Sequence, residues 1–208
     1  MIRRSRYLAL LAASALLTLL SGCSAWGTTG YESAGRQPFN GGLLTPPKEI
    51  APFALKRMDG KPLTLDDTTG RTSLFFFGYT TCPDVCPLTL VHVRQMREAL
   101  GERSRHMDSY FVTVDPERDT PEVMAAYLAR MEPGTVGLTG APEELARAQA
   151  AFGVIAQRRD VPTSSARYFM DHTAAVFLVD EQHQMRLVYP YGMTAEQMTE
   201  DLKRILPR

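Results

Sequence analysis

The chain has 208 residues, of which 44% are hydrophobic and 22% are charged, and these proportions are ordinary for a globular protein. Its 23 basic and 23 acidic residues give a formal net charge of zero. No basic stripe with interleaved aromatic residues occurs, and this argues against nucleic acid as a partner. The length suits one mid-sized domain with an appendage.

The N-terminus has the pattern of an export signal. Three arginines within the first six residues precede the apolar run 7–20, which is too short for a comfortable membrane span of roughly 20 residues. Leu20-Ser21-Gly22-Cys23 follows and resembles the lipobox of bacterial lipoproteins, which implies cleavage before Cys23 and lipid attachment to its thiol. We therefore expect residues 1–22 to be a lipoprotein signal peptide. The alternatives are an uncleaved membrane anchor and a soluble exported protein with an incidental cysteine.

Residues 23–49 are predicted to form a flexible tether from the lipidated Cys23, because they are rich in Gly, Ser, Thr and Pro. The folded domain is predicted to span residues 50–208. It opens with a hairpin signature, in which Phe53–Met58 leads into the turn Asp59-Gly60 and Lys61–Leu65 leads out of it.

Strands and helices then alternate along the chain. The apolar runs predict strands at Ser73–Tyr79, Tyr110–Val114, Thr135–Leu138, Ala174–Val179 and Arg186–Tyr189, the last two forming a closing hairpin. Helical spacing and capping residues predict helices at Pro87–Leu100, Thr120–Met131, Pro142–Phe152 and Thr194–Leu206. This order predicts an α/β fold with one mixed sheet and flanking helices.

Two cysteines lie in the loop Thr81-Cys82-Pro83-Asp84-Val85-Cys86-Pro87, directly after the first buried strand. Each precedes a proline, which favours extended backbone over helix, and Pro83-Asp84 suits the middle of a β-turn. We expect this turn to bring the thiols together. Pro87 would then open the helix and place Cys86 at its positive end, where a thiolate is favoured.

Such a pair can exchange electrons as a dithiol/disulfide couple, or it can hold a soft metal ion such as Cu(I). A purely stabilising disulfide is the weaker explanation, because closing so short a loop removes little entropy from the unfolded chain. Disulfides persist outside the cytoplasm. In an exported protein the pair would therefore be oxidised unless a reductant or a metal acts on it.

Four histidines could add a nitrogen ligand. His92, His106 and His183 fall in a helix, a polar turn and a hairpin tip, where ordinary surface roles are expected. His172 lies in the segment 168–173, directly before a predicted strand. Its distance along the chain from the cysteines does not by itself decide its role.

Three segments together resemble the SCO/SenC family: the cysteine loop, the run Val114–Pro121, and Asp171-His172-Thr173 ahead of Phe177–Asp180. The likeness runs from about residue 50 to the C-terminus, with the motifs in the same order and at similar spacing. Proteins of this family are similar to thioredoxins in fold and assist assembly of the copper site of cytochrome c oxidase. The resemblance therefore implies a thioredoxin-like fold, with a mixed central sheet, flanking helices and the N-terminal hairpin.

The resemblance also implies one copper ion, Cu(I) or Cu(II), bound by Cys82, Cys86 and His172. Two sulfurs and one nitrogen suit Cu(I), while the imidazole keeps Cu(II) accessible. The same two cysteines would form the redox-active disulfide. Asp171 is a candidate for orienting His172 or its loop, whereas Asp84 suits the turn better than the metal. Val114–Pro121 is expected to frame the site.

Two functions remain open at this point. In the first, the chain is a lipid-anchored metallochaperone on the periplasmic face of a bacterial membrane, and it delivers copper to the copper-site subunit of the oxidase. In the second, it is a thiol-disulfide oxidoreductase that reduces the cysteines of that subunit or of another periplasmic copper carrier, and a thiol reductant regenerates it. His172 separates the two, because dithiol exchange does not require a distant imidazole.

Overall fold

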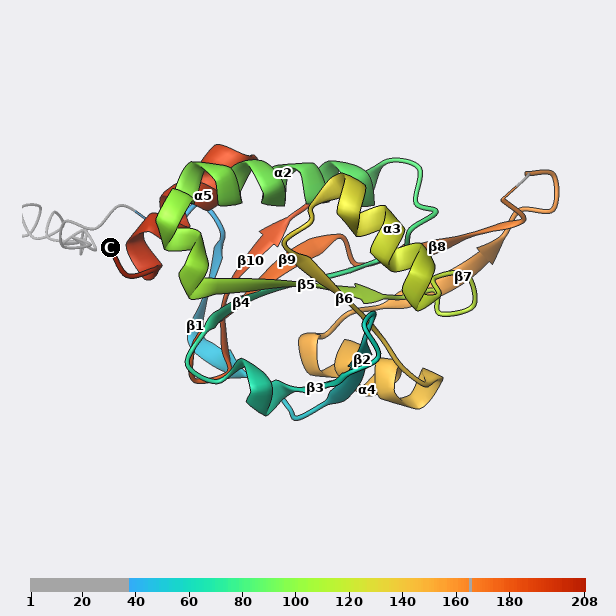
Figure 1. Ribbon diagram of the computed structural model, residues 1–208, viewed down its shortest axis with the longest axis horizontal. Helices are drawn as coiled ribbons and strands as arrows, with labels where there is room; N and C mark the ends of the chain where they lie inside the picture. Colours follow the sequence, from blue (N-terminus) through green and yellow to red (C-terminus); the bar gives the residue numbers. More distant parts are fainter. Residues whose placement is uncertain (1–37, 165) are drawn as a thin grey trace, which may run out of the picture. The chain divides into compact units, whose positions relative to one another are not determined.

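The computed structural model describes residues 38–164 and 166–208, and Phe39–Arg208 form one compact unit. In this part of the chain, eight strands form a main sheet and two form a separate pair (Figure 1). The main sheet contains β1 (Gly42–Glu49), β2 (Ala54–Arg57), β3 (Pro62–Thr64), β4 (Thr72–Gly78), β5 (Met107–Thr113), β6 (Thr135–Thr139), β9 (Ala175–Val179) and β10 (Gln184–Pro190). The separate pair is β7 (Ala156–Asp160) and β8 (Tyr168–His172), and the helices are α2 (Val85–Leu100), α3 (Pro121–Met131), α4 (Pro142–Phe152) and α5 (Ala195–Ile205).

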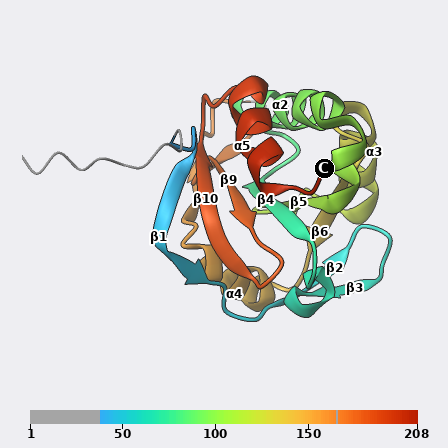
Figure 2. The ribbon, with the colours of Figure 1, turned by 90° about the vertical axis from the view of Figure 1, so that its left-hand side faces the viewer.

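The main sheet is mixed, as the sequence predicted. Its strand order is β1-β10-β9-β4-β5-β6-β2-β3. The neighbours β4, β5 and β6 run parallel, whereas every other neighbouring pair is antiparallel. The helices cover both faces: α2, α3 and α5 lie over one face, and α4 lies over the other (Figure 2).

Strand β4 lies at the centre of the core, and all seven of its residues are buried. Successive side chains of a strand point to opposite faces. Accordingly, Phe75 and Phe77 pack against Phe152 of α4, with ring centroids 4.8 and 5.3 Å apart. Phe76 faces the other way and contacts Phe111 of β5. The continuous apolar run in the sequence therefore reflects a strand that is covered on both faces.

The first strand corrects one prediction. Gly42–Glu49 were expected to belong to the tether, but they form β1 and pair with β10 at the sheet edge. The two residues directly before β1 are bound to α5. The backbone N–H groups of Asn40 and Gly41 donate hydrogen bonds to the Asp201 carboxylate, both at 2.9 Å. Pro46 and Pro47 lie between Leu43 and Lys48, where the pairing register shifts. Proline has no backbone N–H to donate, and an edge strand tolerates this loss.

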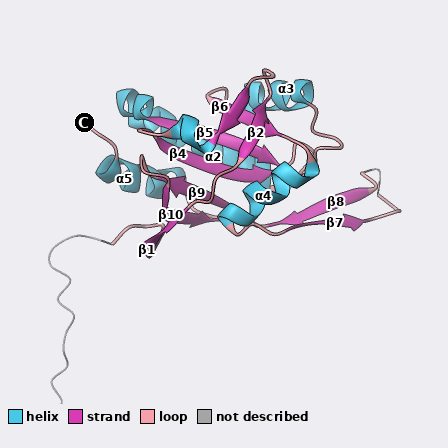
Figure 3. Ribbon diagram, turned by 90° about the horizontal axis from the view of Figure 1, so that it is seen from below, coloured by secondary structure: helices cyan, strands magenta, loops and turns pink. Residues whose placement is uncertain are grey.

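The hairpin of β7 and β8 was not predicted, although its last residue, His172, was singled out. Four of the five residues of β7 are exposed, so the sequence shows no apolar alternation that would indicate a strand. The hairpin extends beyond the end of the main sheet (Figure 3). It carries His172 toward the cysteine loop.

Candidate metal centre

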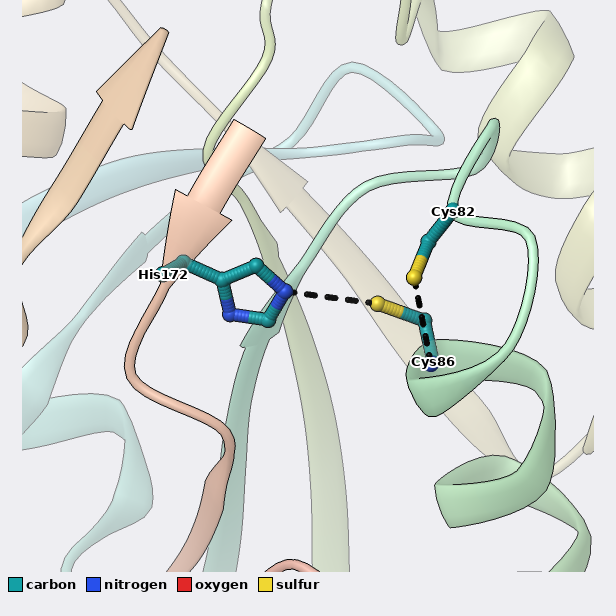
Figure 4. A group of neighbouring side chains, drawn as sticks. All are labelled: Cys82, Cys86 and His172. Atoms are coloured by element: carbon teal, nitrogen blue, oxygen red, sulfur yellow. Dashed lines mark hydrogen bonds between the residues drawn. The ribbon is translucent and has the colours of Figure 1, made fainter. Parts of the chain in front are cut away.

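The N-terminus of α2 meets the end of β8, and three side chains with soft or borderline donor atoms converge there. Cys82 lies in the loop after β4, Cys86 is the second residue of α2, and His172 is the last residue of β8. Their donor atoms all lie within 4.8 Å of one another. Cys86 Sγ and His172 Nε2 lie 3.6 Å apart (Figure 4). The sequence suggested this proximity through the family resemblance, and the structure contains it.

Cys86 adopts helical backbone, which corrects the expectation of an extended conformation before Pro87. Helix α2 begins at Val85, and Pro87 occupies its first turn. Proline is tolerated there, because the first N–H groups of a helix have no acceptor within the helix. The N–H of Cys86, which has no acceptor within the helix, instead donates to Cys82 Sγ at 3.4 Å.

The two thiols consequently differ in protonation. Hydrogen bonding from the Cys86 thiol lowers the pKa of Cys82 to about 3, against the effect of burial, and the N–H groups of Asp84 and Cys86 lower it further. Cys86 is fully buried, and the neighbouring Cys82 sulfur together with burial raises its pKa. In the metal-free reduced site these opposite shifts favour the thiolate on Cys82 over a thiolate on Cys86. These shifts are opposite to the expectation that the thiolate is favoured on Cys86, because the Cys86 thiol donates to the Cys82 sulfur and burial disfavours a charge on Cys86.

His172 presents its Nε2 atom to the cysteines. Its Nδ1 lies 3.1 Å from the carbonyl oxygen of Thr173. A carbonyl only accepts hydrogen bonds, so Nδ1 carries the proton and the lone pair of Nε2 points toward Cys86 Sγ. The ring packs edge-on against Tyr79 and Phe76. This arrangement fixes the tautomer that a metal ligand needs.

A buried carboxylate holds the cysteine loop against the core. Asp119 is 1% exposed and accepts hydrogen bonds from the Thr80 N–H at 3.1 Å, from Thr80 Oγ1 at 2.6 Å and from Thr113 Oγ1 at 2.6 Å. Burial raises the pKa of Asp119, although these hydrogen bonds oppose the shift. The segment Val114–Pro121 therefore frames the site from inside.

The same segment holds the hairpin through Arg118. Its Nη1 donates to the carbonyl oxygens of Ala166 and Tyr168 at 3.3 and 3.2 Å, and its Nε pairs with buried Asp115. The Arg118 guanidinium also lies 3.7 Å from the centre of the Tyr168 ring, and Arg158 approaches that ring at the same distance. The Tyr168 hydroxyl donates to Asp115 at 2.8 Å. The sequence had marked the motif but not these individual roles.

The two candidate acidic residues make other contacts. Asp171 accepts a hydrogen bond from Arg159 Nε at 2.8 Å, so its carboxylate joins β8 to β7, while Thr173 engages the Nδ1 atom of His172. Asp84 occupies the N-cap position of α2 without a capping hydrogen bond from its side chain. The proposed lipidation site, Cys23, lies outside the described residues.

A cavity of about 410 Å³ opens beside the cluster. Its lining includes Cys82 and His172 together with the aromatic and thioether side chains of Tyr79, Phe169 and Met170. The cluster is therefore accessible from one side, whereas the core closes the other side around Cys86.

The donor set fits a single thiophilic metal ion. Thiolate and imidazole bonds of roughly 2.0–2.3 Å to one ion place the donor atoms about 3.5–4 Å apart, so the observed cluster needs only a small contraction. Two thiolates and one neutral imidazole are preferred by Cu(I), Zn(II) and related ions over Mg²⁺ or Ca²⁺. Three ligands and an open side leave room for an incoming donor.

Comparisons with known proteins agree with this geometry. A family model described as SCO1/SenC matches residues 43–207, which span every described strand and helix apart from the first residue of β1. A SCO2-like protein of Rickettsia prowazekii is 30% identical over 152 residues, covering 73% of this chain and 74% of that protein. The copper-bound structure of ScoI from Bradyrhizobium japonicum is 38% identical, with a TM-score of 0.68 over 75% of this chain and 98% of the other. The solution structure of apo Sco1 from Thermus thermophilus is 35% identical, with a TM-score of 0.73 over 83% and 99%.

Proposed function

The chain belongs to the SCO1/SenC family, and from this premise we propose that it is a copper metallochaperone in the assembly of cytochrome c oxidase. One copper ion is bound by Cys82, Cys86 and His172. The observation that carries the proposal is the convergence of these three donors within 4.8 Å, in a chain similar to a protein solved with copper bound.

The protonation states suit uptake of Cu(I). The lowered pKa of Cys82 favours its thiolate, so the proton of Cys86 is the main one that metal binding has to displace. The contact between His172 Nδ1 and the Thr173 carbonyl oxygen leaves Nε2 as the ring atom that faces the cluster. The open side at Cys82 and His172 lets a donor from a recipient protein approach and replace the ligands one at a time.

A metal titration tests the ligand assignment. The reduced protein is titrated with Cu(I) and with Cu(II), beside Cys82→Ser, His172→Ala and the disulfide form. We expect one copper per reduced chain and a large loss of Cu(I) affinity in the other three samples. Equal Cu(I) binding by the oxidised and reduced proteins would falsify the assignment, because the disulfide form offers no thiolates.

The recipient that we propose is the copper-site subunit of the oxidase. The loaded protein is mixed with the metal-free copper-binding domain of that subunit, and the copper content of each is measured after separation. Transfer of copper to the domain supports the proposal. Retention of all copper by the donor under reducing conditions contradicts it.

Thiol-disulfide exchange is a second candidate, and the state of Cys82 favours it. A partly exposed thiolate beside a buried thiol is the arrangement of an attacking and a resolving cysteine. The substrate would be the disulfide form of the same subunit or of another copper carrier, with a periplasmic thiol reductant as the source of electrons. In this reading His172→Ala reduces such a disulfide at a rate within about threefold of wild type, although its copper affinity falls.

We also propose that the protein is exported and held by lipid at the periplasmic face of a bacterial membrane. The lipobox-like sequence ending in Cys23 supports this, with residues 1–22 as the signal peptide. Within residues 38–164 and 166–208, no helix is long and apolar enough to cross a bilayer. Labelled palmitate should be incorporated into wild type and not into Cys23→Ala, and an unlabelled wild type would refute lipidation.

A further inference from the structure

Gly78 is the last residue of β4, and its backbone is held firmly on the sheet. It pairs with Thr113 of β5, and its carbonyl oxygen accepts a hydrogen bond from the N–H of Val114 at 2.8 Å. Successive side chains of a strand point to opposite faces, so a side chain at position 78 would point to the same face as Phe76. Helix α2 lies over that face (Figure 2) and carries Cys86 in its first turn.

A side chain at position 78 would collide with its surroundings. A Cβ atom there would lie 2.9 Å from Cys86 Sγ, 2.9 Å from Cε2 of Phe111 and 3.1 Å from Cε1 of Phe76. Favourable contacts between non-bonded carbon atoms lie at about 3.5–4.0 Å, so all three neighbours would be too close. The Cys86 sulfur and the two ring edges therefore occupy the space that a side chain of residue 78 would need.

The three neighbours differ in how easily they could give way. Phe111 and Phe76 are 0% and 3% exposed, and their rings pack against each other with centroids 5.8 Å apart. Because protein interiors are close-packed, neither ring has room to retreat. The Cys86 sulfur is also buried, but it ends a short side chain that turns about a single bond. A side chain at position 78 would therefore displace the sulfur first, by roughly half an ångström or more.

We propose that Gly78 is a positioning residue of the candidate metal centre, because its missing side chain fixes the place of Cys86 Sγ opposite His172 Nε2. These two donor atoms lie 3.6 Å apart. A binding site keeps its function only while its groups stay within about 0.5 Å of their places. Gly78 acts through the sulfur and does not bind the ion. The packing part of this inference stands without a metal, whereas its copper part rests on the proposed function.

A double-mutant cycle without metal tests the packing. Gly78→Ala and Cys86→Ala are made singly and together, and the unfolding of the reduced proteins is followed in urea. We expect Gly78→Ala to lower the equilibrium constant for folding. This loss should be at least about fivefold smaller in the Cys86→Ala background, because the sulfur no longer occupies the space. An equal loss in both backgrounds overturns the inference, since the sulfur would then not be the obstacle.

Gly137→Ala is the matched control. Gly137 lies in β6, and a Cβ atom there would also be close to core side chains, at 3.2 Å from Leu128 and 3.3 Å from Met58. Neither of these residues belongs to the metal centre or lines the cavity beside it. The loss caused by Gly137→Ala should therefore agree within about twofold with and without Cys86→Ala.

A second background keeps the cycle decisive if Gly78→Ala does not fold in the wild-type chain. Phe111→Leu removes the other contact that would be closer than 3.0 Å. In that background, Gly78→Ala should fold better together with Cys86→Ala than with the native cysteine. Failure to fold in both cases overturns the inference, because something other than the sulfur would then exclude the side chain.

Copper binding tests the positioning itself. The two reduced glycine variants are titrated with Cu(I) in competition with a chelator. We expect the affinity of Gly78→Ala to fall at least about tenfold, because one sulfur is displaced from the other two donors, and that of Gly137→Ala to stay within about twofold of wild type. Wild-type affinity in Gly78→Ala overturns the inference. Failure of wild type to bind copper would instead overturn the proposed function, and the metal-free cycle would still decide the role of Gly78.

Discussion

The two halves of the candidate metal centre are held by different means. The cysteine half belongs to the core: Cys86 is fully buried, and Asp119 ties its loop to the central strands. The histidine half projects from the core on a hairpin with an exposed outer strand, and Arg118 is its main polar attachment. Regions with few buried contacts open at low free energy. We therefore expect the thiols to be preset and the hairpin that carries His172 to be the half of the centre that opens more readily.

The largest expected effect concerns the cysteine half of the metal centre. Asp119→Ala leaves the Thr80 N–H and two hydroxyls without their acceptor, so we expect the free energy of unfolding to fall by about 3 kcal/mol. Asp119→Asn retains an acceptor oxygen and should lose less than half as much. Urea denaturation of the reduced proteins measures both. An alanine variant as stable as wild type would show that the loop is not anchored here.

The next largest effect concerns the histidine half of the metal centre. His172→Ala should weaken Cu(I) binding by well over tenfold, which is about 1.4 kcal/mol or more, because it removes one of three donors. The free energy of unfolding should change by less than about 1 kcal/mol, since the side chain is only partly buried at the end of the hairpin. Competition with a Cu(I) chelator gives the affinity. His106→Ala, at an exposed position, is the control that should bind normally.

A smaller change should loosen the hairpin alone. Arg118→Lys keeps a positive charge beside Asp115. It loses the planar guanidinium, whose Nη1 donates hydrogen bonds to the carbonyl oxygens of Ala166 and Tyr168 in the hairpin. We expect amide hydrogen exchange in β7 and β8 to accelerate about fivefold, which corresponds to about 1 kcal/mol, with β4 and β5 unchanged. Arg159→Lys, in an exposed ion pair with Asp171, should change exchange by less than twofold. Equal acceleration in β4 would contradict two separately held halves.

The smallest effect is a pH dependence of the free energy of unfolding, which arises from Asp119 in the cysteine half of the metal centre. Burial raises the pKa of Asp119, so the folded protein binds a proton there more tightly than the unfolded chain. The stabilisation from that proton is full below the unfolded pKa of about 3.9 and is lost as the pH rises through the folded pKa. Wild type should therefore lose stability relative to Asp119→Asn from about pH 4 toward neutrality. A constant difference across this range would rule out the raised pKa.

Much of the fold could be predicted because its central elements carry their own signals. Strand β4 is a continuous apolar run, and α2 buries Leu90, Val93, Met96 and Leu100 at helical spacing. Strand β1 could not be predicted in this way. It depends on pairing with a strand far along the chain and on the Asp201 carboxylate, and two prolines mask its pattern.

The site was predictable in part. A Pro-rich cysteine pair after a buried strand indicates functional thiols on its own, whereas His172 entered only through the family resemblance. The protonation of the two thiols could not be predicted, because it depends on which sulfur is buried and which faces the helix N-terminus.

The pairing of β1 with β10 fixes the point at which the chain enters the folded unit. Asn40, where the chain enters, is bound to α5, and α5 and the β7–β8 hairpin lie at opposite ends of the unit (Figures 1 and 3). Residues 24–38 can span at most about 50 Å in any conformation. If Cys23 is lipidated as proposed, the anchor would hold the folded unit at the end opposite the candidate metal centre, and that centre would face away from the point of attachment.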